Sequence, residues 1–309
     1  MNQVMYDAIQ DFDLHAEARG LSGLTRRWYR DQVRLFGEFI EQHQVEPTAI
    51  DERIFLQFLV HERRRGLADK TIADRHLALG VFFRWCEQRN YFNGLRSPVT
   101  AANRPKVVQK EPRWVTLAQY EQLHASIAAD SWLDHRDRLL LALMFSCGLR
   151  IGEVAGLGIG NVDLMRRRLK LKASSSKSRR DRYAPFSESV QVLAQTYLTH
   201  RPDEYPLALF LSDDGYGGVR GIMTKHAITP MLKRRCAHAR MDYMNPHSFR
   251  HGFAMTMLNQ GGAELSSVST LLGHASVTTT EAAYARWLID PLQEAYDEAQ
   301  QRLRAKKTR

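Results

Sequence analysis

Cysteine is scarce in this chain. The 309 residues include only three, Cys86, Cys147 and Cys236, and each stands alone in an apolar or basic stretch. No two of them have the close spacing of a zinc site, and isolated thiols provide no disulfide framework. We therefore expect inert core thiols in a reducing compartment, and no metal site.

Long apolar runs are also missing. No stretch of about 18 apolar residues is present, which argues against a transmembrane helix. The first residues, Met-Asn-Gln-Val-Met-Tyr-Asp, lack the basic start and apolar run of a secretory signal. These absences predict a cytoplasmic protein that does not associate with a membrane.

Acidic residues are in the minority. The chain has 44 Lys and Arg against 34 Asp and Glu, a formal net charge of +10. A globular protein with this surplus of positive charge most often binds a polyanion, and nucleic acid is the commonest polyanion. On charge alone, a basic protein without a nucleic-acid role remains the alternative. Hydrophobic residues make up 44%, enough for real cores, and the length suggests two domains.

Residues 1–100 have the pattern of a small helical bundle. Apolar side chains recur at roughly helical spacing within 25–40, 51–65 and 71–88, and Gly66 is a candidate cap for the second of these helices. The basic side chains between them predict either contacts with DNA phosphates or a merely solvated face. The candidates for phosphate contacts on these helices are Arg26, Arg27, Arg30, Lys70 and Arg75.

A proline-rich segment follows the first domain. Three prolines fall between residues 98 and 112, where the apolar periodicity stops. Prolines this close together break helices, so the segment is expected to be irregular. We predict a linker at 101–113, between a first domain at 1–100 and a second at 114–309.

The second domain is expected to contain both helices and strands. Thr116 is a plausible N-cap for the first helix, and the apolar run at 137–147 predicts a core helix. Short alternating stretches predict a small antiparallel sheet. They cover 162–164, 169–172 and 182–186. From Ser189 onward the pattern returns to helices, and the tail from about residue 290 reads as an amphipathic helix with a basic end. The predicted fold class is mostly α with a small antiparallel β-sheet (α+β).

The region 245–284, together with one motif upstream, holds the most informative residues. The groups are Arg150 in Gly-Leu-Arg-Ile-Gly-Glu, His247 and Arg250 in His-Ser-Phe-Arg, His274 in Leu-Leu-Gly-His, and finally Tyr284. Cations and imidazoles around one tyrosine are what an enzyme needs to attack a phosphodiester through a covalent intermediate. Each residue alone has an ordinary structural explanation. The ordered set of five favours the functional one.

Each residue type suits a particular task at a phosphate. A guanidinium can bond two phosphate oxygens and stays charged at any working pH, which suits Arg150 and Arg250. His247 precedes Arg250 by three residues, so on a helix it shares a face with it and could bond the phosphate or accept the tyrosine proton. His274 could add a further donor. His247 and His251 could instead form a metal pair, but no acidic or cysteine partner stands near them.

These motifs resemble those of the tyrosine recombinases, also called the phage-integrase family, in its Xer-like two-domain form. The likeness covers nearly the whole chain and is specific in the C-terminal domain. It implies that the two domains, an N-terminal helical bundle and a catalytic domain, form a clamp around duplex DNA. Glu153 follows Arg150 by three residues and, by analogy with the groups that orient metal ligands, is expected to orient an active-site cation. The resemblance also implies six active-site positions. The six positions are Arg150, Lys177, His247, Arg250, His274 and the nucleophile Tyr284.

The lysine in this set is placed by its position in the predicted sheet. The family's lysine lies in the turn between two strands, and counting back from Arg-Tyr-Ala-Pro185 gives Lys177. Lys172 is the nearest rival and would move the lysine off the turn. By the resemblance, Lys177 protonates the departing 5′ oxygen. Arg179 and Arg180, close by, are further candidates for DNA contact.

The spacing before the tyrosine departs from the family's pattern. The family usually has its tyrosine nine residues after the second histidine, whereas Tyr284 follows His274 by ten and Ala283 takes the expected position. One residue on a helix is a rotation of about 100°. The extra residue must therefore be absorbed in the turn before the helix if Tyr284 is to face the other groups.

The resemblance implies a site-specific DNA recombinase that works through a 3′-phosphotyrosyl intermediate and a Holliday junction. The ester keeps the bond energy, so no ATP is needed, and cations replace metal ions, so no metal or other cofactor is expected. The implied partners are duplex DNA with paired specific sites and further copies of the chain in a tetramer, joined through the helix from about residue 290. The protein would be cytoplasmic and nucleoid-associated. The alternatives are a catalytically inactive, sequence-specific DNA-binding accessory protein and a type IB topoisomerase-like enzyme.

Overall fold

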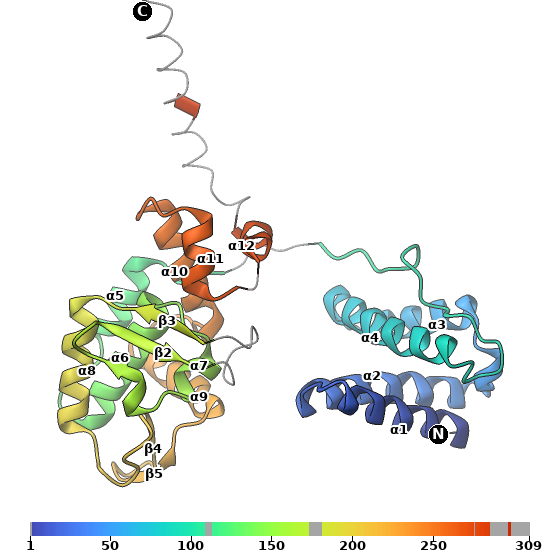
Figure 1. Cartoon of the computed structure of the whole chain (residues 1–309), viewed down its shortest axis with the longest axis horizontal. Helices are drawn as coiled ribbons and strands as arrows, with labels where there is room; N and C mark the ends of the chain where they lie inside the picture. The colour runs from blue at the N-terminus through green and yellow to red at the C-terminus, as the bar shows by residue number, and fades with distance from the viewer. Residues whose placement is uncertain (1, 109–112, 173–180, 275, 285–295, 298–309) are drawn as a thin grey trace, which may run out of the picture. The chain divides into compact units, whose positions relative to one another are not determined.

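The computed structural model divides the chain into two compact units, residues 1–110 and 111–309 (Figure 1). It describes residues 2–108, 113–172, 181–274, 276–284 and 296–297. Within these ranges, no helix combines the length and the apolar character needed to cross a membrane. The tail helix expected from about residue 290 falls outside the described residues, apart from 296–297.

The first unit is helical in its described residues. Its elements are α1 (Gln3–Ala18), α2 (Gly23–Gln42), the 3-10 turn η1 (Pro47–Ala49), α3 (Glu52–Arg64) and α4 (Asp69–Gln88). The three helices predicted from periodicity correspond to α2, α3 and α4, whereas α1 was not singled out. Side chains cap the starts of α2 and α3: Ser22 accepts from the backbone of Thr25, and Asp51 from that of Ile54. Gly66 ends α3 with a φ of +80°, as predicted.

Aromatic side chains join the four helices of this unit. Phe36 of α2 meets Phe58 of α3 and Phe83 of α4 edge to face, with ring centroids 5.2 and 5.4 Å apart. Phe12 of α1 contacts Phe82 of α4 in the same way, at 5.4 Å. All five rings are buried. Such pairs add to the free energy gained from apolar burial, so the unit has a core of its own.

Part of the proline-rich segment packs on the first unit. Val99 lies against the hydrophobic core, and Asn103 accepts a hydrogen bond at 2.9 Å from Nε2 of His76 on α4 when that nitrogen carries the proton. Asn103 also donates to Glu52 at 3.0 Å and to the carbonyl of Pro98 at 2.8 Å. These bonds fix the chain at Asn103, two residues inside the segment expected to be a linker.

The second unit contains most of the described elements. Its helices are α5 (Leu117–Ala125), α6 (Trp132–Ser146), α7 (Ile151–Ala155), α8 (Glu188–His200), α9 (Lys225–His238), α10 (Pro246–Asn259), α11 (Leu265–Leu272) and α12 (Val277–Tyr284), with the 3-10 turn η2 (Ile159–Asn161). Its strands are β1 (Val162–Asp163), β2 (Arg168–Leu171), β3 (Arg182–Pro185), β4 (Leu211–Asp213) and β5 (Val219–Ile222). Thr116 caps α5 through a capping box with Gln119, which confirms the predicted start of that helix.

The sheet predicted around residues 162–186 is present. Strands β1, β2 and β3 form an antiparallel sheet in that order, with Leu169 opposite both Val162 and Ala184. The prediction of helices alone from Ser189 onward was wrong, because β4 and β5 form a second antiparallel hairpin. These strands are three and four residues long, too short for a clear alternation, and only their pairing in the fold stabilises them.

The core helix predicted at 137–147 is α6. Residues 139–145 on it are buried without interruption, and the helix packs against both α8 and α10. Helices α10, α11 and α12 gather at one end of the unit, with α10 at the side of α6 (Figure 1). The end of α6 is therefore fixed against α10, which places the following turn beside the other motifs found in the sequence.

Candidate active site

Arg150 lies in the tight turn that follows α6. Gly148 has a φ of +60°, and a β-carbon there would collide with the ring of Phe253, so this turn requires glycine. Arg150 then caps α7. Its backbone N–H and its Nη1 both donate to Glu153, at 2.9 and 3.0 Å. Glu153 is buried while the Arg150 side chain keeps 25% of its surface, so Glu153 holds a guanidinium that still reaches solvent.

Arg250 comes from the first turns of α10. Asn245 caps this helix by accepting from the backbone N–H groups of His247 and Ser248, and Pro246 fills its first position. Arg250 is buried, with 2% of its surface exposed. It donates to the carbonyl of Gly148 at 2.6 Å and to that of Leu272 at 2.7 Å.

One of the two carbonyls that hold Arg250 belongs to a helix end. Gly148 lies in the turn after α6, whereas Leu272 is the last residue of α11, where carbonyl groups have no partner inside the helix. The partial negative charge at such ends attracts a cation. Burial, and then the charge of Arg150, lower the pKa of Arg250 to about 9, which still leaves its guanidinium protonated at neutral pH.

Arg182 is a third arginine at the same place, and sequence reasoning missed it. It is the first residue of β3, and its Nη2 donates to both oxygens of Glu153, at 3.1 and 2.9 Å, and to the carbonyl of Leu272 at 3.3 Å. It therefore shares Glu153 with Arg150 and the Leu272 carbonyl with Arg250. Its Nε and Nη1 are buried without a hydrogen-bond partner. Strand periodicity could have pointed to Arg182, because it stands two residues before the buried Ala184 and so lies on the inward face of the strand.

The Leu-Leu-Gly-His motif forms the junction between α11 and α12. Gly273 ends α11 with a φ of +66°, and a β-carbon there would overlap Nε of Arg182. Its carbonyl accepts a weak bond from Arg150 at 3.4 Å. His274 follows, with Nδ1 2.7 Å from the hydroxyl of the buried Thr280 on α12. Burial, then the charges of the three arginines, lower the pKa of His274 to about 4, so it is neutral.

Tyr284 is the last residue of α12 and faces inward, with 2% of its surface exposed. Thr280 precedes it by four residues and is buried on the same face. The chain has one residue more between His274 and the tyrosine than the family usually has. Because α12 begins at Val277, this spacing still leaves Tyr284 on the buried face of the helix. Burial raises the pKa of Tyr284 to about 12, against a smaller opposing effect of Arg250.

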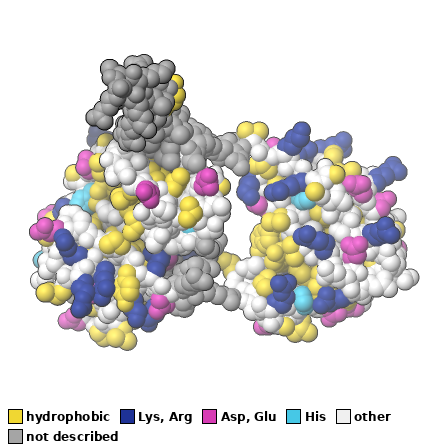
Figure 2. Space-filling model, turned by 45° about the horizontal axis from the view of Figure 1, so that its top comes forward, with side chains coloured by type: hydrophobic (Ala, Val, Ile, Leu, Met, Phe, Trp, Pro, Cys, Tyr) yellow, Lys and Arg dark blue, Asp and Glu magenta, His cyan; other side chains and the backbone are white. Residues whose placement is uncertain are grey.

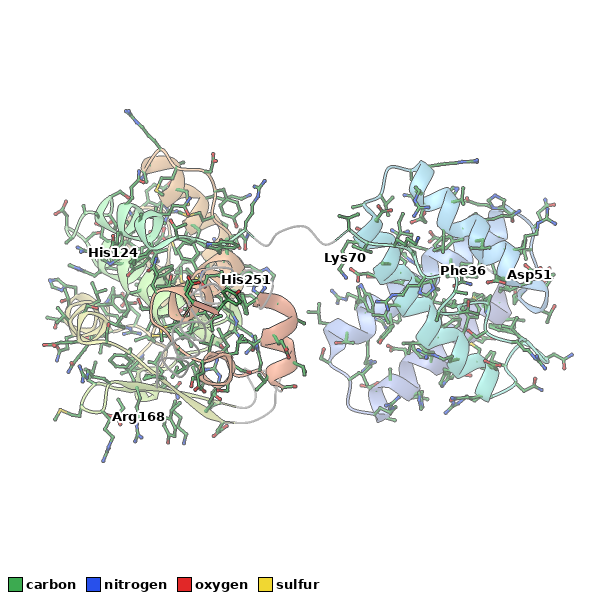
Figure 3. The ribbon with its side chains drawn as sticks, turned by 90° about the horizontal axis from the view of Figure 1, so that it is seen from above. Phe36, Asp51, Lys70, His124, Arg168 and His251 are labelled. Carbon is green, nitrogen blue, oxygen red and sulfur yellow. The ribbon has the colours of Figure 1, made fainter. Side chains whose placement is uncertain are left out.

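The side chain bonded to the Tyr284 hydroxyl is His251, with a distance of 2.7 Å to Nδ1. His251 stands beside α12 in Figure 3, and its ring meets that of Tyr284 at 5.4 Å between centroids. His247, one turn earlier on α10, is exposed, and its ring packs on His251 at 4.3 Å. The sequence offered His251 only as half of a metal pair. No group of three or more His, Cys, Asp or Glu suited to a metal occurs among the described residues.

Comparisons with known proteins place the chain in a family. A model described as "Phage integrase family" matches residues 113–288, more than half of the chain, and one described as "Phage integrase, N-terminal SAM-like domain" matches residues 9–90. This chain belongs to the phage integrase family. It is a tyrosine recombinase.

Relatives of similar length support the same assignment for this tyrosine recombinase. The tyrosine recombinase XerC of Xylella fastidiosa is 31% identical, over 95% of this chain and 96% of its own. That of Corynebacterium efficiens is 32% identical, over 96% and 92%. Among solved structures, the XerH recombinase bound to a palindromic difH substrate has a TM-score of 0.72 at 24% identity, covering 90% of this chain and 81% of its own. The Tn1549 transposon integrase with transposon right end DNA has a TM-score of 0.73 at 19% identity, over 94% and 99%. These two structures share the fold.

Three of the predicted site residues, Lys177, Arg179 and Arg180, lie outside the described residues. They belong to the segment that joins β2 to β3. Lys172, the rival for the lysine position, directly follows β2 and is exposed.

The basic candidates of the first unit differ in exposure and pairing. Arg26 and Arg30 both bond Asp13, and Lys70 pairs with Asp74. Arg75 is paired with the buried Glu62 and only 11% of its side chain is exposed, which leaves little of it for a phosphate. Arg27 is exposed. Figure 2 shows Lys and Arg side chains spread over the visible face of this unit, and Figure 3 shows Lys70 at its edge.

Proposed function

We propose that this tyrosine recombinase cuts and rejoins DNA at specific sites, with Tyr284 as the nucleophile. Tyr284 attacks the scissile phosphate, the P–O5′ bond breaks, and a 3′-phosphotyrosyl ester forms. Attack by the 5′ hydroxyl of the partner strand on that ester exchanges the strands through a Holliday junction. The observation that carries this proposal is the clustering of three arginines at the C-terminal end of α11, where the charge of Arg250 acts on the buried Tyr284.

The charges of the cluster match those of the reaction. Arg150, Arg182 and Arg250 bring three positive charges and Glu153 one negative charge, so the net charge is +2 when the histidines are neutral. A phosphodiester carries one negative charge, and a second develops as the phenolate oxygen attacks. Fixed cations aimed at developing charge lower the barrier without having to reorganise. Arg150, with a quarter of its side chain exposed, is the one placed to bond the phosphate oxygens.

The remaining groups complete the proposed reaction. The exposed His247 and the neutral His274 donate hydrogen bonds to the phosphate, and Lys177 protonates the departing 5′ oxygen. Glu153 orients Arg150 by accepting a hydrogen bond from its Nη1. The ester retains the bond energy, so rejoining needs no ATP.

Structures of the same fold that contain DNA support a DNA partner for this chain. The XerH structure contains a palindromic substrate and the Tn1549 integrase structures contain transposon ends or circular intermediates, which supports paired duplex sites as the partner here. We propose that four copies assemble on two such sites, joined through the tail from about residue 290. Basic side chains of the first unit contact phosphates of the bound duplex. They are Arg26, Arg27, Arg30 and Lys70.

Covalent capture tests this function. The full chain is incubated with a library of nicked duplexes and denatured in detergent, and the DNA that remains attached is sequenced. Adducts that share a core sequence, and that disappear in Tyr284→Phe, are the expected result. Sequence-selective binding without any adduct would contradict the proposal and indicate a non-catalytic DNA-binding protein.

A further inference from the structure

The Tyr284 hydroxyl is held by a group outside the six expected active-site positions. Its hydrogen bond, 2.7 Å long, is to Nδ1 of His251 on α10. His251 is partly buried and directly follows Arg250, so the residue that binds the Gly148 and Leu272 carbonyls also fixes the backbone beside it. The position of His251 relative to Tyr284 is therefore set by the arginine cluster.

We propose that His251 is a catalytic residue that accepts the phenolic proton of Tyr284 during cleavage and returns it during rejoining. As the Tyr284 Oη–P bond forms, the proton moves to Nδ1 of His251 and the P–O5′ bond breaks. The 5′ oxygen takes its proton from Lys177 in the proposed function, on which this inference rests. Rejoining reverses both proton transfers, so atoms and charges balance over the cycle.

The surroundings of His251 keep it in the form that can accept a proton. Burial, then His247, Arg250 and His274, lower its pKa to about 4, so the ring is neutral at physiological pH. Tyr284 stays protonated because its own pKa is raised to about 12. In the free protein the proton therefore stays on Tyr284. A phosphate bound in the site adds negative charge that favours imidazolium, and bond formation to phosphorus makes the phenol far more acidic.

The structure assigns a different position to His247, the other imidazole on α10. Its ring is exposed and lies 4.3 Å from that of His251 in an edge-to-face arrangement, one helical turn nearer the start of the helix. An exposed imidazole beside the cluster suits a donor to a phosphate that arrives from solvent. The two histidines therefore differ in role, and they provide a matched pair for an experiment.

The test compares His251→Asn with His247→Asn in the full chain, on the nicked duplex recovered by covalent capture. Asparagine places an amide near the position of Nδ1 but cannot accept a proton at working pH. Each variant is also prepared with 3,5-difluorotyrosine at position 284, whose phenol is more acidic and needs less help from a base. We expect His251→Asn to slow adduct formation about 10²-fold or more, the usual contribution of a general base.

The fluorinated tyrosine should recover most of the rate lost in His251→Asn and little of that lost in His247→Asn. The inference would be overturned if His251→Asn cleaved the duplex at the wild-type rate. It would also be overturned if the fluorinated tyrosine did not recover the rate lost in His251→Asn. Recovery in His247→Asn alone would assign the base to His247 instead. If His251→Asn fails to bind the duplex, His251→Gln replaces it. Absence of adducts with the wild-type chain would contradict the proposed function itself, which keeps the two failures distinct.

Discussion

Arg182 connects the two arginines that the motifs reveal. It bonds Glu153, which also holds Arg150, and the Leu272 carbonyl, which also holds Arg250. Both contacts are made by Nη2, and the side chain of lysine is one bond shorter, so its ammonium group falls short of these two partners. In Arg182→Lys we therefore expect displacement of both neighbouring guanidiniums and about a 10²-fold slower formation of the covalent adduct.

A second substrate separates positioning from general damage in Arg182→Lys. A duplex with a methylphosphonate at the scissile position has no charge there to neutralise, so the variant should lose much less rate on it. Equal losses on the two duplexes, or weaker binding that explains the whole loss, would show that Arg182 only supports the fold.

Gly273 combines a left-handed backbone with close packing on Arg182. Its φ is +66° and a β-carbon would overlap Nε of Arg182, whereas Gly262, with a φ of +60°, has nothing within 4 Å of that position. Alanine at either site should cost about 1–2 kcal/mol of unfolding free energy for the left-handed conformation. Only Gly273→Ala should also slow adduct formation sharply, because it displaces Arg182. Chemical denaturation and covalent capture on both variants check this, and equal activities would contradict it.

At the scale of the element, α12 decides which residue can be the nucleophile. Thr280 and Tyr284 share its buried face, while Ala283 is displaced from that face by about 100°. We expect the double variant Ala283→Tyr, Tyr284→Ala, which restores the family's usual spacing, to form no adduct although it binds the duplex. An adduct on the relocated tyrosine would mean that the turn before α12 readjusts.

The two histidines that contact α12, His251 and His274, predict that the unfolding free energy depends on pH. The pKa of both His251 and His274 is lowered from 6.5 to about 4, so between these values the unfolded chain binds more protons than the folded one. The unfolding free energy should therefore fall as pH falls from about 6.5 to about 4. Urea denaturation at pH 7 and pH 5 measures this. The fall should be smaller in His274→Gln, and an unchanged fall would count against the assignment.

Other elements show where sequence patterns were sufficient and where they were not. The long amphipathic helices α2, α3 and α4 were predicted because one apolar face repeats over many residues. The hairpin of β4 and β5 was missed because strands of three and four residues have too little pattern, and their stability comes from pairing. Similarly, Asn103 lies in a segment without periodicity, yet it is fixed by bonds to His76 and Glu52 from distant helices.

At the scale of the whole molecule, the two units have separate hydrophobic cores. One cluster lies within residues 5–95, and the other two lie within 115–284. Because no described cluster includes residues of both units, we expect residues 1–108 and 113–309, expressed separately, to fold and to unfold cooperatively. Calorimetry should resolve two transitions in the full chain that match those of the fragments. A single transition in the full chain, with unfolded fragments, would contradict this.

The sequence by itself determined the family and the mostly helical fold. It also predicted a site made of Arg150, His247, Arg250, His274 and Tyr284, because these residues lie in short motifs whose chemistry can be read directly. Only the tertiary structure revealed Arg182 and the bond between His251 and Tyr284. The reason is physical: Glu153, Arg182 and Leu272 are far apart in sequence and meet only when β3 lies beside α7 and the end of α11. A hydrogen bond between side chains 33 residues apart likewise depends on how two helices pack, which no local pattern specifies.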